Sequence, residues 1–116
     1  MRKNCAEAMD AWNSNERGGK PGSAIWTDGV HVYSYQTCLL AYREAGDLLD
    51  LEQEAVVVVN ATRYSVTTST HQSGIAEYLN RYFGGDFIAL DGFPFGVTPD
   101  EVLTRYDEEV SCLDRA

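Results

Sequence analysis

The chain has 116 residues, a formal net charge of −9 and 44% hydrophobic residues. This length supports one hydrophobic core and this composition is that of a folded chain, so we predict a single domain spanning residues 1–116. The excess of carboxylates repels phosphate backbones and argues against direct nucleic-acid binding.

The cysteine pattern and the hydropathy pattern bear on the compartment. Cys5, Cys38 and Cys112 are odd in number, widely spaced and free of CxxC pairs, which favours reduced thiols over a disulfide framework. The sequence contains no signal-like apolar run and no stretch of about 18 apolar residues. We therefore expect a cytoplasmic protein that is neither secreted nor membrane-bound.

The first half of the chain predicts a helix followed by a β-meander. Residues 3–15 carry apolar side chains at helical spacing, and the Gly- and Pro-containing residues 15–23 form a connector. Asp28-Gly29 lies between two strand-like runs and predicts a hairpin with a type I′ turn. Residues 37–42 read as a further strand. Residues 52–64 contain another, whose four consecutive valines indicate burial on both faces.

The second half predicts two helices around a short strand. An apolar stripe of helical period starts near Ser69 and ends at Gly84-Gly85, and residues 86–90 follow as a strand. Thr98 and Glu101 frame a second helix start. The fold we expect is α+β, a mainly antiparallel sheet with the helices packed on one face.

The hydroxyl-rich segment at residues 60–73 is open to two interpretations. In the structural one, Ser69 and Gln72 form a capping box and His71 faces the core. In the functional one, Arg63, Ser69, His71 and Gln72 surround a helix N-terminus that binds a small anion or polar ligand. We favour the structural interpretation, with a neutral, hydrogen-bonding His71.

Catalytic and metal chemistry have weak support in the sequence. Ser65 or Ser69 with His71 lacks the context of a nucleophilic triad, and His31, His71 and Cys38 lack the spacings of a metal site. We expect no enzymatic activity, no cofactor and no metal.

Two clusters of carboxylates are candidates for a partner-binding surface. The first cluster comprises Glu44, Asp47, Asp50, Glu52 and Glu54, and the second comprises Asp107, Glu108, Glu109 and Asp114. Both suit either a solvated face or electrostatic complementarity to a basic groove. In the loop at residues 92–96, Phe93 and Phe95 are either an exposed apolar anchor or a means of pinning the turn to the core.

Two blocks of the sequence suggest a kinship. The block "WTDGVHVYSYQT", followed by "NATRYSVTTSTHQSGI", resembles a small domain of unknown function found among bacteriophage and mobile-element reading frames. The resemblance covers residues 26–75. The positions that carry it are Asp28, Gly29, Tyr33, Ser34, Tyr35, Asn60, Thr62, Tyr64, Ser65, Thr67, Thr68, Ser69, His71 and Gln72.

The resemblance implies a phage setting but no mechanism, because that family carries no established activity. Small acidic phage proteins of this kind are associated with inhibition of CRISPR-Cas and other defence systems. We therefore expect a non-enzymatic accessory protein that binds a basic, nucleic-acid-handling host protein through Asp47, Asp50, Glu52, Glu54, Asp107, Glu108, Glu109, Phe93 and Phe95. A small-ligand binder or enzyme using the hydroxyl-rich segment, and a phage assembly factor acting as an oligomer, are the alternatives; a homodimer stays open.

Overall fold

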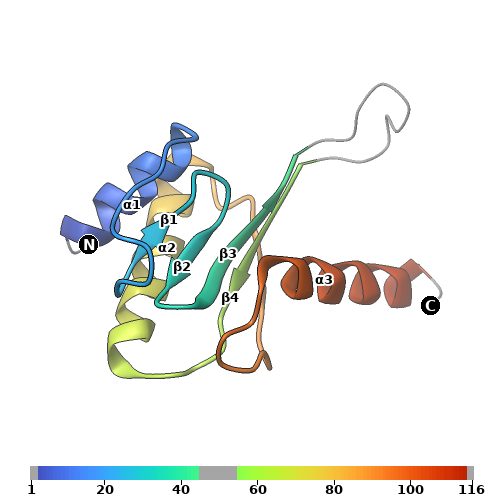
Figure 1. Ribbon diagram of the computed structural model, residues 1–116. Helices are drawn as coiled ribbons and strands as arrows, with labels where there is room; N and C mark the ends of the chain where they lie inside the picture. Colours follow the sequence, from blue (N-terminus) through green and yellow to red (C-terminus); the bar gives the residue numbers. More distant parts are fainter. Residues whose placement is uncertain (1–2, 45–54, 115–116) are drawn as a thin grey trace.

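The computed structural model describes residues 3–44 and 55–114, and these residues form an α+β fold, as the sequence predicted (Figure 1). The helices are α1 (Lys3–Asn13), α2 (Val66–Tyr82) and α3 (Pro99–Asp114). The strands are β1 (Trp26–Thr27), β2 (Val32–Ser34), β3 (Thr37–Arg43), β4 (Val56–Asn60) and β5 (Ile88–Leu90). None of the described helices is long and apolar enough to cross a membrane.

The strands form one sheet in the order β1-β2-β3-β4-β5. The first four pair antiparallel in sequence order, which is the predicted meander. Strand β5 pairs parallel with β4, with Val58 opposite Ile88. Parallel neighbours need a long crossover connection, and α2 provides it.

Helices cover both faces of the sheet, which corrects the single helical layer expected from the sequence. Leu40 and Val59 belong to the core cluster shared with α1 and α2, whereas Ala41 and Val58 contact the cluster that contains Val102 of α3. Neighbouring residues of a strand point to opposite faces, so the two clusters lie on opposite sides of β3 and β4. Strands that are apolar on both faces require cover on both.

The predicted N-terminal helix is confirmed as α1. Its side chains Cys5, Ala8, Met9 and Trp12 are buried against the core. Cys5 and Cys38 are free, and burial raises the pKa of Cys5 to about 11 and that of Cys38 to about 12. Both thiols are therefore protonated and inert at neutral pH.

The Asp28-Gly29 hairpin exists, but its turn is not of type I′. Strands β1 and β2 pair Thr27 with Val32, which leaves four residues in the loop, and Asp28 has no positive φ. The Asp28 carboxylate instead accepts hydrogen bonds from the backbone N–H groups of Val30 and His31, at 2.9 and 2.8 Å. A side chain that satisfies the loop backbone in this way permits a wider turn.

Candidate functional site

The hydroxyl-rich segment contains the start of α2, one turn earlier than the sequence suggested. Ser65 is the N-cap: its backbone is extended, and its hydroxyl accepts a hydrogen bond from the Thr68 N–H at 3.2 Å. The predicted capping box at Ser69 and Gln72 is therefore wrong. Several hydroxyl residues in a row offer equivalent caps, and the apolar stripe that begins at Ile75 does not distinguish between them.

Gln72 has a different structural role. Its side-chain amide donates to the carbonyl oxygens of Asn60, at 2.6 Å, and Thr62, at 2.8 Å. It thus ties the second turn of α2 back to the end of β4. The Gln72 amide nitrogen is therefore bonded to the backbone of the strand-to-helix connection and does not face the pocket proposed from the sequence.

Asn60, Thr62 and Tyr64 bind the same connection to the loop before α3. The fully buried Asn60 side chain donates to the Cys38 carbonyl and to the Tyr64 hydroxyl, both at 3.0 Å. The Tyr64 hydroxyl contacts the Phe93 carbonyl, and the Thr62 hydroxyl accepts from the Phe93 N–H, each at 3.0 Å. These polar residues, which carried the family resemblance, are used here to join two connections of the fold.

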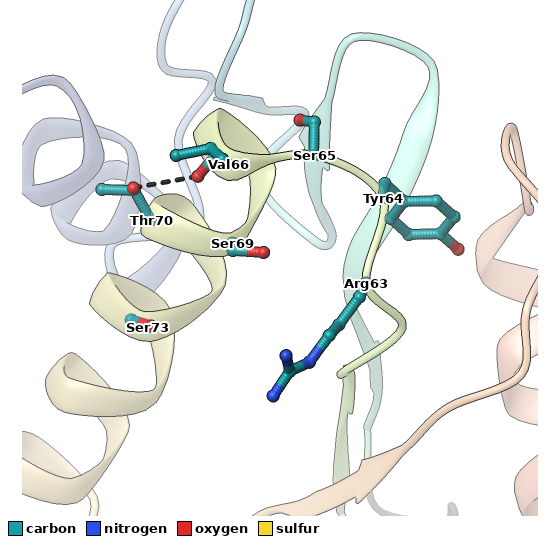
Figure 2. Close-up of a pocket in the computed structure, with 7 residues that line it drawn as sticks. All are labelled: Arg63, Tyr64, Ser65, Val66, Ser69, Thr70 and Ser73. Carbon is teal, nitrogen blue, oxygen red and sulfur yellow. Dashed lines mark hydrogen bonds between the residues drawn. The ribbon is translucent and has the colours of Figure 1, made fainter.

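An open pocket of about 400 Å³ lies between this connection and α2 (Figure 2). It is lined by Arg63, Tyr64, Ser65, Val66, Ser69, Thr70 and Ser73. Figure 2 shows the Ser69 and Ser73 hydroxyls directed from α2 toward the side on which Arg63 lies. Thr70 is occupied locally, because its hydroxyl donates to the Val66 carbonyl at 3.0 Å.

The four residues predicted to form a polar pocket do not come together. Arg63 and Ser69 line the pocket, whereas Gln72 binds the backbone and His71 is only 4% exposed. The His71 carbonyl lies 3.8 Å from the Cys5 sulfur, so this residue packs against α1, as the core-facing interpretation predicted. Tyr64, Ser65, Val66, Thr70 and Ser73 were missed as lining residues. With the helix start correctly placed, the i, i+4 spacing of Ser65, Ser69 and Ser73 would have indicated the two additional serines.

The carboxylates of α3 differ in how they are engaged. Asp107 forms a bidentate ion pair with Arg43, at 3.0 and 2.8 Å, and Glu109 pairs with Arg105 at 3.0 Å. Glu108 is exposed and forms no ion pair within the described part of the chain. Asp47, Asp50, Glu52 and Glu54 lie outside the described residues.

The loop before α3 separates the two phenylalanines. Phe93 is buried, with the Arg105 guanidinium 5.6 Å from its ring centroid, and so pins the turn to the core. Phe95 is 71% exposed and meets the edge of Tyr64 at a centroid distance of 6.0 Å. Of the two alternatives raised by the sequence, pinning the turn to the core therefore applies to Phe93, and an exposed apolar side chain applies to Phe95.

His31 completes the sheet instead of facing a ligand. Its Nδ1 accepts a hydrogen bond from the Tyr42 N–H at 3.0 Å, which ties the loop before β2 to β3 just beyond the Val32–Leu40 pair. Burial lowers the pKa of His31, so the ring is neutral and its proton is on Nε2 at neutral pH. Within residues 3–44 and 55–114, no group of three or more His, Cys, Asp or Glu side chains is placed to hold a metal ion.

The chain matches no protein-family model, no curated protein sequence and no solved structure. Its own surface is therefore the basis for inferring its function.

Proposed function

We propose that this protein acts by binding a partner protein through an acidic stripe on the outer side of α3. The stripe consists of Asp100, Glu101, Asp107 and Glu108, all of which are exposed. At 100° per residue these positions fall within about a third of the helix circumference. Val102 points the other way, into the core beneath the sheet.

The placement of these charges is the observation that supports the proposal. Asp100 and Glu101 lie in the first turn, where negative charge stabilises a helix. The Thr98 hydroxyl caps this turn: it accepts a hydrogen bond from the Glu101 N–H and donates one to the Glu101 carboxylate. Asp107 and Glu108 lie two turns further on and have no capping role. A stripe of carboxylates on one exposed helix face suits a partner with a basic surface.

A surface that normally holds nucleic acid is the type of basic surface that such a stripe would fit. In the phage setting suggested by the sequence, the partner is a host nucleic-acid-handling complex, and the effect of binding is inhibition of host defence. Phe95, exposed in the loop before α3, would add an apolar contact next to the charged one.

Affinity capture from host lysate with two variants of equal charge tests this proposal. The stripe variant carries Asp100→Asn, Asp107→Asn and Glu108→Gln, and the control variant carries Glu7→Gln, Glu16→Gln and Asp91→Asn. Both change the net charge from −9 to −6, since three carboxylates are neutralised in each. We expect the wild type and the control to capture the same basic protein, with an association rate that falls as salt rises. Capture of that protein by the stripe variant at the wild-type rate would contradict the proposal.

The pocket at Arg63 supports a second candidate, the binding of a small anion. The exposed guanidinium, the Ser69 and Ser73 hydroxyls and the nearby N-terminus of α2 suit an oxyanion such as phosphate. Inorganic phosphate should shift the backbone NMR signals of Ser69 and Ser73 in the wild type and not in Arg63→Gln. Equal shifts in both proteins would remove this candidate.

A further inference from the structure

Three aromatic side chains from different elements line a second pocket, on the face of the sheet opposite α3. They are Trp12 of α1, Tyr42 of β3 and Phe83, which follows α2 as its C-cap. The remaining lining residues are Asn13, Asn15, Glu44, Ala55, Val57 and Asp86. The pocket has a volume of about 300 Å³, at the small end for ligand sites, so it suits one side chain better than a large ligand. We call it the aromatic pocket.

The rings of the aromatic pocket meet at steep angles. Trp12 lies 6.1 Å from Tyr42 at an interplanar angle of 87°, and 5.6 Å from Phe83 at 61°. The Trp12 indole N–H donates to the Val30 carbonyl at 2.8 Å, which fixes the orientation of the central ring. Rings at such angles cannot all stack on one flat ligand. They form walls of different orientation around a compact group.

Carboxylates and amides accompany these apolar walls. Glu44 and Asp86 are exposed, and neither side chain forms an ion pair or hydrogen bond with another described residue. Both are therefore available to an incoming charge, in contrast to Glu109, which is paired with Arg105. The Asn15 side chain adds an amide at the same pocket, and the Asn13 side chain, which also lines it, is hydrogen-bonded to Tyr78.

We propose that the aromatic pocket binds the cationic head of an arginine or lysine side chain from a partner protein. The faces of aromatic rings carry partial negative charge and attract organic cations, and the two carboxylates strengthen that attraction. Ala55 and Val57 offer an apolar wall for the aliphatic stem of the same side chain. A neutral apolar group would gain nothing from the carboxylates, and an anion would be repelled by them.

The aromatic pocket is independent of the acidic stripe. Tyr42 packs with the cluster of α1 and α2, whereas its neighbour Arg43 reaches Asp107 of α3. The two surfaces thus lie on opposite faces at the same end of β3. Both predict a basic partner, but either can fail alone, because each has its own variants.

NMR titration of the full chain with capped amino acids tests the pocket. The Trp12 indole N–H signal reports binding, and the Trp26 indole N–H serves as internal reference because Trp26 stacks on Tyr33, away from the pocket. The probes are N-acetyl-arginine amide and N-acetyl-lysine amide, with N-acetyl-citrulline amide as the neutral counterpart of arginine. We expect both cations to shift the Trp12 signal, and citrulline to bind weaker by about fivefold or more. Equal binding of citrulline would show an apolar pocket without charge recognition and overturn the proposal.

Variants measure separately what the aromatic rings and the carboxylates contribute to binding. Phe83→Leu keeps an apolar side chain but removes one aromatic face, and should weaken arginine binding by about threefold or more. Glu44→Gln with Asp86→Asn should weaken it at least as much. The matched control, Glu16→Gln with Asp91→Asn, makes the same change in net charge and should bind as the wild type does. An unchanged Trp26 signal verifies the fold of each variant.

Three further outcomes would overturn the proposal. Wild-type affinity of Phe83→Leu would show that the aromatic faces are not used, and equal weakening by the control would reduce the effect to bulk charge. Tetramethylammonium distinguishes the source of the cation. If it shifts Trp12 while the arginine and lysine amides do not, the pocket takes a small free cation and not a partner's side chain.

Discussion

The two faces of the sheet are stabilised in different ways. On one face, α1 and α2 pack on each other and on β3 through a large cluster of buried side chains that includes Met9, Leu40 and Leu79. On the other, α3 covers β3 and β4 through a smaller cluster built around Val58, Val97 and Val102. The first face depends on apolar area, and the second has less of it.

Specific polar contacts supplement the smaller cluster. The Cys38 N–H donates to the Val97 carbonyl and the Gly96 N–H donates to the Thr37 hydroxyl, each at 3.0 Å. These bonds fix the loop that leads into α3, and the Arg43–Asp107 ion pair fixes the helix further along. The α1/α2 face, with the larger buried cluster, therefore carries most of the stability. The α3 face is positioned by a few contacts and leaves its outer side to solvent.

The largest effect should follow from truncation on the α1/α2 face. Leu79→Ala removes a fully buried side chain and should lower the free energy of unfolding by about 2–5 kcal/mol. Val102→Ala, equally buried on the α3 face, should lower it by about 1–3 kcal/mol, because fewer methyl groups are lost. Denaturant unfolding of both variants measures the difference. A Val102→Ala variant less stable than Leu79→Ala would show that the α3 face contributes more stability than the size of the truncated side chain accounts for.

A smaller loss of stability is expected when the N-cap of α2, in the connection from β4 to α2, is removed. Ser65→Ala removes the N-cap of α2 and should cost about 0.5–2 kcal/mol. Ser69→Ala, inside the helix, should change stability by less than about 0.5 kcal/mol. Thermal unfolding of the pair decides which serine caps the helix. Equal losses would indicate that the start of α2 shifts between the two.

The sequence predicted the elements better than it predicted their junctions. Helical periodicity located α1 and most of α2, and Thr98 marked the start of α3, because these signals are local. The start of α2 was missed because Ser65 and Ser69 are chemically equivalent caps. Only the position of β4 and its partners selects between them.

For the candidate surfaces, too, the sequence predicted what depends on local signals and missed what depends on packing between elements. The sequence identified Asp107, Glu108 and Phe95, whose exposure follows from helical period or loop position. It could not identify the aromatic pocket, because Trp12, Tyr42 and Phe83 are about 30 and 40 residues apart along the chain and meet only through the packing of three elements. It also grouped His71 and Gln72 with Arg63, since spacing alone does not reveal that His71 is buried and that the Gln72 amide donates to backbone carbonyls.

The loop between β1 and β2 should make stability depend on pH. Burial lowers the pKa of His31, although the Asp28 and Asp100 carboxylates oppose this. The unfolded chain therefore takes up a proton at higher pH than the folded one, and stability should decrease as pH falls below about 6.5. Unfolding measured at pH 7.5 and 5.5 should show a smaller decrease for His31→Gln than for the wild type. Identical decreases would mean that His31 titrates alike in both states.

At lower pH the same loop should lose a second contribution. Burial acts to raise the pKa of Asp28, but hydrogen bonds from the His31 and Val30 N–H groups and the Tyr33 hydroxyl outweigh it and lower the pKa below 3.8. A lowered carboxyl pKa gives stability that is present above the unfolded value and is lost as pH falls through the folded one. Asp28→Asn should flatten the stability profile below about pH 4. An unchanged profile in that range would assign the acid loss to other carboxyls.

The smallest effect should come from the ion pair that holds α3 to β3. Asp107 is half exposed, so water screens the bidentate pair with Arg43, and the coupling energy should be only about 0.2–1 kcal/mol. A double-mutant cycle with Arg43→Gln and Asp107→Asn measures it, and the coupling should decrease in high salt. The Arg105–Glu109 pair, within one helix, is the control and should give about 0.3–0.5 kcal/mol. If the Arg43–Asp107 coupling is well above 1 kcal/mol and independent of salt, the pair is a structural clamp. Asp107 would then be removed from the acidic stripe, and Asp100, Glu101 and Glu108 would have to account for partner binding.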